Sequence, residues 1–99
     1  MASIFPWHWF SRSPAQRPDL QVLLYTRAAC PLCDEAAELL DGYQKRYGFV
    51  LAAKNVDEAV ELVREFGQCV PVVTINGQVR FRGRINEVLL QRILHAKQA

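Results

Sequence analysis

Two cysteines, Cys30 and Cys33, stand between an apolar run and a helical pattern. The run is Leu20–Tyr25, and Pro31-Leu32 separates the cysteines. Such a pair can close a small disulfide ring and open it again, and a helix N-terminus stabilises the thiolate of the first cysteine. The spacing alone equally allows half of a zinc site. The placement between a strand and a helix instead predicts a redox site.

The length of 99 residues predicts one domain. The composition, 51% hydrophobic and 22% charged, is typical of a globular chain. A net charge of +2 predicts no nucleic-acid partner. Three cysteines do not suggest a structural disulfide framework. We therefore expect a cytoplasmic protein with a working dithiol pair, and we expect a monomer.

The first ten residues, Met1–Phe10, are rich in aromatic side chains, and a polar linker, Ser11–Asp19, follows them. They lack the pattern of a signal peptide, and no segment has the roughly 18–20 apolar residues of a transmembrane helix. Residues 1–19 are thus interpreted as leader and linker, and residues 20–99 as the domain. The leader either packs partly on the domain or anchors it to a membrane surface or a partner, since Trp favours interfaces.

Hydrophobic periodicity predicts four strands and three helices. The strands are Leu20–Thr26, Phe49–Asn55, Val70–Ile75 and Gln78–Arg82. One helix starts at Pro31 and ends at Gly48; the next is Glu58–Phe66 with Asp57 as its N-cap; the last is Asn86–Ala96, burying Val88, Leu89, Leu90 and Ile93.

The dipeptide Asn76-Gly77 is a strong hairpin signal, so the last two strands should be antiparallel. The first two strands flank a helix, which predicts a parallel pair with a right-handed crossover. The order β-α-β-α-β-β-α predicts an α/β chain with the thioredoxin fold, in which three helices cover a four-stranded mixed sheet.

Three segments between Leu20 and Leu94 resemble the thioredoxin superfamily, and within it the glutaredoxin-like proteins. They are Leu24-Tyr25-Thr26-Arg27 leading into Cys30-Pro31-Leu32-Cys33, then Val70-Pro71-Val72-Val73, and Asn76-Gly77 through Gly83-Arg84. Gly83-Arg84 replaces the usual Gly-Gly and resembles a little-characterised bacterial group. The resemblance implies a small thiol–disulfide oxidoreductase with no bound cofactor, acting on a protein or small-molecule disulfide. Glutathione or thioredoxin reductase would be the electron donor.

Cys30 is predicted to be the nucleophile, and Cys33, one turn inside the helix, to resolve the mixed disulfide. Arg27 either stabilises the thiolate and holds a substrate carboxylate or is a plain solvated loop charge. The resemblance implies a cis Pro71 that leaves the backbone of Val70 to pair with an extended substrate; a trans proline opening the strand is the alternative. Arg84, near the expected groove, is a candidate ligand for a substrate carboxylate.

Three residues depart from the usual glutathione site of glutaredoxins. Leu32 replaces an aromatic residue, Cys69 a threonine, and Arg84 a glycine. We therefore expect weak glutathione binding. Cys69 is either an accessory thiol, resolving or glutathionylated, or a small buried apolar residue. His8 and His95 lie outside the motifs, so we expect no metal site; an iron–sulfur cluster shared across a dimer has little in its favour.

A second class of function stays open. The same fold could serve as a binding module that recognises a partner through the Val70–Pro71 groove with little redox turnover. The aromatic leader, Met1–Phe10, is the feature that favours this hypothesis.

Overall fold

The computed structural model describes residues 17–96. The leader Met1–Phe10 lies outside the described residues, and so do the two predictions made for it, packing on the domain and anchoring to a membrane surface or a partner. Four strands form one sheet in the order β2-β1-β3-β4. They are β1 (Gln21–Thr26), β2 (Val50–Asn55), β3 (Val72–Ile75) and β4 (Gln78–Arg82). Strand β1 pairs in parallel with β2 and antiparallel with β3, and β3 pairs antiparallel with β4. The predicted mixed sheet and thioredoxin fold are confirmed.

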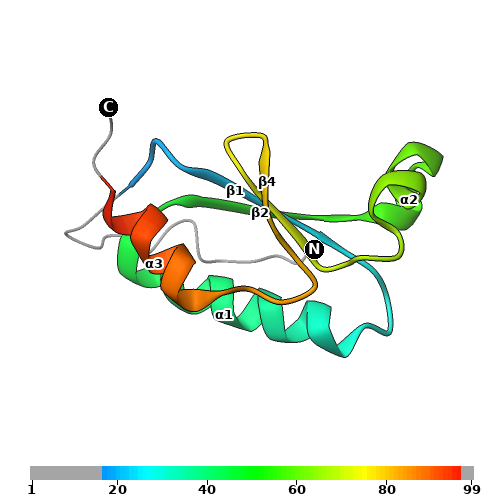
Figure 1. Cartoon of the computed structure of the whole chain (residues 1–99), viewed down its shortest axis with the longest axis horizontal. Coiled ribbons are helices and arrows are strands. Elements are labelled where there is room, and N and C mark those ends of the chain that lie inside the picture. Colours follow the sequence, from blue (N-terminus) through cyan, green and yellow to red (C-terminus); the bar gives the residue numbers. More distant parts are fainter. Residues whose placement is uncertain (1–16, 97–99) are drawn as a thin grey trace.

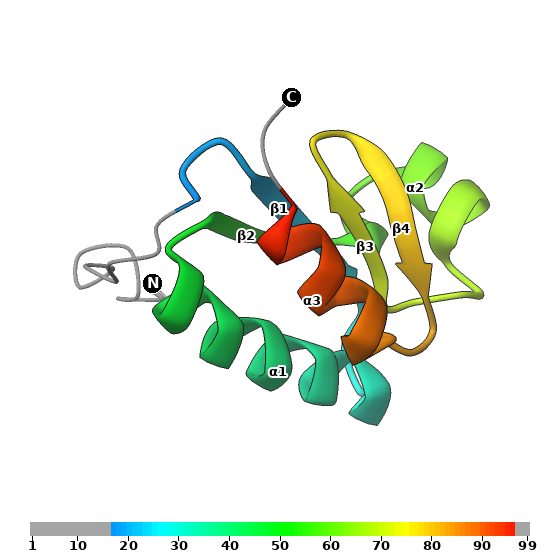
Figure 2. The same cartoon turned by 60° about the vertical axis from the view of Figure 1, so that its left-hand side comes forward.

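The helices divide between the two faces of this sheet. They are α1 (Pro31–Tyr47), the short 3₁₀ helix η2 (Val56–Glu58), α2 (Val60–Phe66) and α3 (Glu87–His95). Figure 1 shows α1 and α3 together on one face, and Figure 2 shows α2 on the far side of β3 and β4. The main core lies beneath α1 and α3, and a smaller cluster around Val56, Phe66 and Val72 lies beneath α2. Within the described part of the chain, no helix has the length and apolar character needed to cross a membrane.

Helix α1 begins and ends where the sequence predicts. Pro31 occupies its first turn, where a missing N–H costs nothing, and the preceding Cys30 is the N-cap. At the other end Gly48 has a φ of 71° and donates its N–H to the carbonyl of Gln44. This left-handed conformation suits glycine and stops the helix.

The predicted N-cap of the second helix is wrong. Asn55, not Asp57, caps the turn, because its side chain accepts the N–H of Asp57 and starts η2. Helix α2 starts only at Val60, after an extended Ala59 that makes no side-chain cap hydrogen bond. The carboxylate of Asp57 binds the guanidinium of Arg27 instead.

The last helix has a different buried face from the one predicted. Val88 and Leu89 are 64% and 41% exposed, whereas Leu90 and Leu94 are 0% and 2% exposed. The predicted burial of Leu90 is confirmed, and Ile93 packs partly buried against the core. The residues that point inward are four apart and therefore share a face of the helix.

The hairpin turn has positive φ angles at both central residues, 53° at Asn76 and 83° at Gly77, as the dipeptide predicts. Beyond the turn the register shifts: Val79 pairs with Thr74, but Phe81 pairs with Val73. The extra residue is Arg80, an irregularity that the sequence did not signal. As a result Phe81 packs in the core beneath α1 and α3, whereas Val79 packs against the cluster beneath α2.

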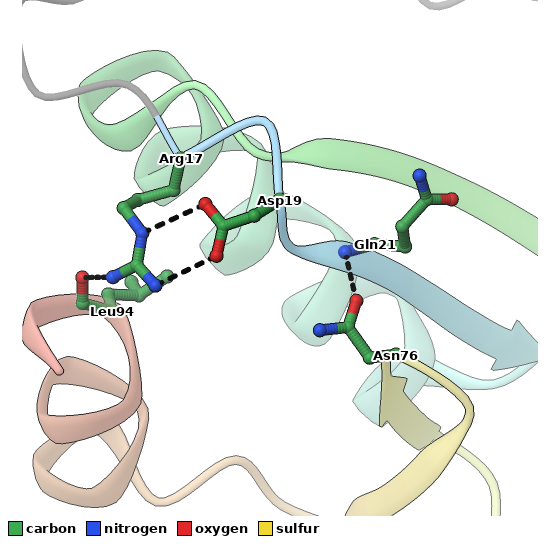
Figure 3. Close-up of polar contacts among 5 residues, drawn as sticks. All are labelled: Arg17, Asp19, Gln21, Asn76 and Leu94. Carbon is green, nitrogen blue, oxygen red and sulfur yellow. Dashed lines mark hydrogen bonds and ion pairs between the residues drawn. The ribbon is translucent and has the colours of Figure 1, made fainter. Parts of the chain in front are cut away.

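Polar contacts fasten the segment before β1 to the rest of the domain (Figure 3). The guanidinium of Arg17 pairs with Asp19 and donates to the carbonyl oxygen of Leu94 at the end of α3. The side chain of Asn76 accepts the N–H of Gln21, which holds the hairpin turn against the start of β1. The boundary between linker and domain near Leu20 stays a prediction.

Candidate active site

Cys30 and Cys33 are joined by a disulfide at the N-terminus of α1, with their Cα atoms 5.2 Å apart. The Sγ of Cys30 accepts the N–H of Cys33 at 3.1 Å. Cys33 is 1% exposed, whereas Cys30 is partly exposed. In the reduced protein the same N–H and the helix dipole would stabilise a thiolate on Cys30. Cys30 is therefore the more exposed of the two cysteines and the one whose thiolate the helix favours.

The segment before β3 lies at the same edge of the sheet as these cysteines. The peptide bond between Val70 and Pro71 is cis, as the resemblance implied. Strand β3 then pairs antiparallel with β1, with Val72 opposite Tyr25. The chain therefore enters β3 at the end of the sheet where it leaves β1 for residues 27–30, the cysteine loop. Val70 is half-buried, and Pro71 is fully buried.

The loop after β4 is fastened to this proline segment. The N–H of Gly83 points to two carbonyl oxygens, that of Pro71 at 2.8 Å and that of Cys69 at 3.2 Å. Gly83 has a φ of 80°, a conformation that other residues rarely adopt. The next residue, Arg84, is exposed and lies 3.9 Å from the carboxylate of Glu35 on α1.

A groove of about 250 Å³ runs between the start of α1 and this loop. It is lined by Leu32, Glu35, Ala36 and Leu39 from α1 and by Gly83, Arg84, Ile85 and Glu87 from the loop and α3. The groove begins at Leu32, between the two cysteines. Sequence reasoning named Arg84 and missed the acidic members Glu35 and Glu87. The spacing of Leu32, Ala36 and Leu39 on one side of α1 is the signal that could have indicated a second apolar stripe.

Arg27 has different partners from those its predicted role requires. Its Nε and Nη2 atoms bind the carboxylate of Asp57 at 3.1 and 2.8 Å, and its Nη1 donates to the carbonyl of Gly67 at 2.8 Å. The hydrogen bonds that Arg27 donates to Asp57 lower the pKa of Asp57 and raise the pKa of Arg27. Arg27 thus joins the cysteine loop to η2 and to the end of α2. A substrate carboxylate would have to displace Asp57 to reach it.

Cys69 is a free, half-buried thiol beside the proline segment. It packs against the cluster beneath α2, and its Sγ lies 3.6 Å from Nη1 of Arg82. Partial burial fits a packing role, and partial exposure leaves the accessory-thiol prediction open. Residues 17–96 contain no group of three or more His, Cys, Asp or Glu side chains that could hold a metal ion.

Comparisons with known proteins identify a family and several similar chains. The family model of the glutaredoxin-like domain (DUF836) matches residues 21–95. A probable thioredoxin of Methanothermobacter thermautotrophicus is 33% identical over 67 residues, which cover 65% of this chain and 79% of that protein. An uncharacterized protein of Mycobacterium tuberculosis is 35% identical over 72 residues, or 68% of this chain and 74% of that one.

Among solved structures, the solution NMR structure of protein Ne2328 from Nitrosomonas europaea is similar, with a TM-score of 0.68 and 24% identity. The similarity covers 78% of this chain and 92% of that one. At this level of identity the likeness concerns the fold alone.

Proposed function

The chain belongs to the family of glutaredoxin-like domains, and from that premise we propose that it is a thiol–disulfide oxidoreductase working through Cys30 and Cys33. The family and the cysteine pair support a thiol redox role in general. One observation carries the more specific proposal. The two bonded cysteines differ in exposure, since Cys30 caps α1 and is partly exposed, whereas Cys33 is buried.

This difference in exposure between the two cysteines indicates the order of the reaction steps. The thiolate of Cys30 attacks one sulfur of a substrate disulfide; the substrate S–S bond breaks, and the leaving thiolate takes up a proton from solvent. Cys33 then loses its proton and attacks the Sγ of Cys30, which releases the second substrate thiol. Two electrons have passed to the substrate, and the Cys30–Cys33 disulfide has formed. A thiol donor reverses these steps on the protein and restores the dithiol.

Other residues near the cysteines supply binding rather than chemistry. We assign the backbone of Val70, which is positioned by the cis peptide bond to the buried Pro71, to an extended substrate segment, because it lies at the end of the sheet where the chain leaves β1 for Cys30. Arg84 would contact the substrate from the groove. Arg27 is better explained as a positioning residue, since Asp57 and the carbonyl of Gly67 already occupy its donors.

Thioredoxin reductase is the donor we favour over glutathione. The groove beside Leu32 carries Arg84 together with the carboxylates of Glu35 and Glu87, a poor match for the carboxylates of glutathione. We place the reaction in a reducing, cytoplasmic compartment and assign it to the monomer. The rival function, a binding module with little turnover, is supported by the aromatic leader alone.

The test is a redox titration of the full chain, combined with turnover of a model disulfide. We expect a reversible Cys30–Cys33 couple within the range of cellular thiols, lost in Cys30→Ser and in Cys33→Ser. Turnover should be faster with thioredoxin reductase and its reductant than with glutathione and glutathione reductase. A couple that no cellular thiol can reduce would leave the binding module as the better explanation.

A further inference from the structure

The groove beside the cysteines has an apolar floor and a charged rim. Leu32, Leu39 and Ile85 are only partly exposed, and Ala36 is buried between them. Leu32, which separates Cys30 from Cys33 in the chain, lines this groove, so a group bound at Leu32 contacts the residue between the two cysteines. The volume of about 250 Å³ suits a large side chain with its neighbouring backbone.

The rim carries more negative than positive charge. Glu35 and Glu87 supply two carboxylates, and Arg84 supplies one guanidinium, which lies 3.9 Å from Glu35. The carboxylate of Glu87 is held in place by the hydroxyl of Tyr43 at 2.8 Å, and that hydroxyl in turn accepts a hydrogen bond from Gln91 at 2.7 Å. The guanidinium of Arg84 therefore already lies beside the carboxylate of Glu35, and the carboxylate of Glu87 is held by Tyr43.

Such a rim selects among disulfides by charge. A ligand with a carboxylate meets two like charges and one partnered guanidinium, and like charges brought together at a binding surface disfavour the wrong partner. Glutathione brings two carboxylates and one ammonium group. A protein segment with an apolar side chain and a neighbouring lysine or arginine matches both the floor and the rim.

We propose that this groove selects protein disulfides whose reacting cysteine is flanked by a large apolar residue and a cationic one, and that it disfavours glutathione. The proposal rests on the proposed oxidoreductase function and adds its substrate class. The apolar side chain lies on Leu32, Leu39 and Ile85, and the cation pairs with Glu35 and Glu87.

The experiment uses peptides whose cysteine is capped as a mixed disulfide with thionitrobenzoate, which absorbs visible light once released. One peptide carries Leu and Lys beside the cysteine; a second replaces Lys with Glu, and a third replaces Leu with Ser. Glutathione capped in the same way is the fourth substrate. Pre-reduced full-length protein is mixed with each, and the second-order rate of release is measured. We expect the Lys peptide to react roughly three- to tenfold faster than the Glu peptide, the Ser peptide or glutathione. A solvent-exposed ion pair or a small apolar contact is strong enough to produce a difference of this size.

Two charge-reversal variants locate the effect. Glu35→Lys changes the rim, whereas Asp34→Lys makes the same change one residue away, at an exposed position that does not line the groove. Both alter the field at the helix N-terminus, so both shift the rates of all four substrates together. Only Glu35→Lys should reverse the preference between the Lys and Glu peptides and raise the rate with glutathione relative to the rate with the Lys peptide.

Equal rates for the four substrates in the wild type would overturn the groove proposal, and so would the same Lys-to-Glu ratio in both variants. In those cases a release of thionitrobenzoate that is much slower in Cys30→Ser shows that Cys30 is the attacking thiol and that the proposed oxidoreductase function still stands. If Cys30→Ser releases thionitrobenzoate as fast as the wild type, the reaction belongs to another thiol such as Cys69, and both the groove proposal and the proposed function fall.

Discussion

The carbonyl oxygen of Pro71 accepts the N–H of Gly83 at 2.8 Å, so the loop that carries Arg84 is fastened to the segment that enters β3. The same N–H lies 3.2 Å from the carbonyl oxygen of Cys69. One backbone donor therefore joins the proline segment to the loop that forms one wall of the groove beside the cysteines. The arrangement requires a left-handed residue at position 83, where φ is 80°.

Gly83→Ala should therefore destabilise the domain by about 1–2 kcal/mol, the cost of a left-handed conformation for an L-residue. Among the described residues, a Cβ at position 83 meets no atom within 4 Å, so the cost is conformational and not steric. Urea unfolding measures it. Gly42→Ala is the matched control: Gly42 lies within α1 with open space around it, and alanine there should stabilise by about 0.5–1 kcal/mol. Equal effects of the two changes would contradict the argument.

The ion pair between Arg27 and Asp57 should make stability depend on pH in the acid range. Because Arg27 lowers the pKa of Asp57 in the folded state, the pair stabilises the fold above the ordinary carboxyl pKa of 3.8. That contribution is lost as the pH falls through the lowered pKa of the folded protein. Asp57→Asn should therefore reduce stability at neutral pH, and its deficit relative to wild type should shrink below about pH 4.

The double variant checks that Arg27 is the partner. In an Arg27→Gln background, Asp57→Asn should have a much smaller effect, because the interaction is already gone. Steady-state turnover distinguishes a positioning role of Arg27 from a role as a substrate ligand. Positioning predicts that Arg27→Gln and Asp57→Asn impair turnover alike, whereas a rise in KM for Arg27→Gln alone would restore Arg27 as a substrate ligand.

Helix α3 offers a direct test of which face is buried. Leu90→Ala should cost about 2–5 kcal/mol, as for other large buried side chains cut to alanine. Val88→Ala, at a position that is 64% exposed, should stay within about 0.5 kcal/mol of wild type. Denaturant unfolding of both variants decides it, and a large loss for Val88→Ala would support the face expected from the sequence.

The parts of the fold that the sequence predicted depend on near neighbours. Pro31 and Gly48 mark the ends of α1, and Asn76-Gly77 specifies its turn, because each conformation is decided within a few residues. The parallel order of the first two strands follows from the helix between them. The cysteine site belongs to this class, since its strand, loop and helix are contiguous.

The parts that were predicted wrongly depend on distant partners. Asp57 does not cap a helix, because Arg27, which is 30 residues away, binds its carboxylate. In helix α3 the carboxylate of Glu87 accepts a hydrogen bond from Tyr43, which is 44 residues away, and Leu90 and Leu94 pack in the core beneath the helix. The acidic rim of the groove was missed for the same reason, since Glu35 meets Arg84 only in the fold. Local pattern carries no information on such pairs.

The order of the two sulfurs is tested by trapping. Cys33→Ser should accumulate a mixed disulfide with a substrate, because the buried resolving thiol is gone while Cys30 still attacks. Cys30→Ser should trap no substrate on Cys33, since Cys33 is 1% exposed. Non-reducing gels and intact mass measure both. Alkylation of the reduced wild type should modify Cys30 well before Cys33, and equal rates at the two thiols would contradict the assignment.

The same trap decides the role of Cys69, the half-buried thiol beside the proline segment. If Cys69 only packs against the cluster beneath α2, then Cys33→Ser and the double variant Cys33→Ser/Cys69→Ser should hold the mixed disulfide equally long. If Cys69 is a second resolving thiol, the single variant should release its substrate slowly and acquire a Cys30–Cys69 bond, which peptide mapping would detect. Its partial burial and its place in that cluster lead us to expect equal lifetimes. A longer lifetime in the double variant would make Cys69 part of the redox site.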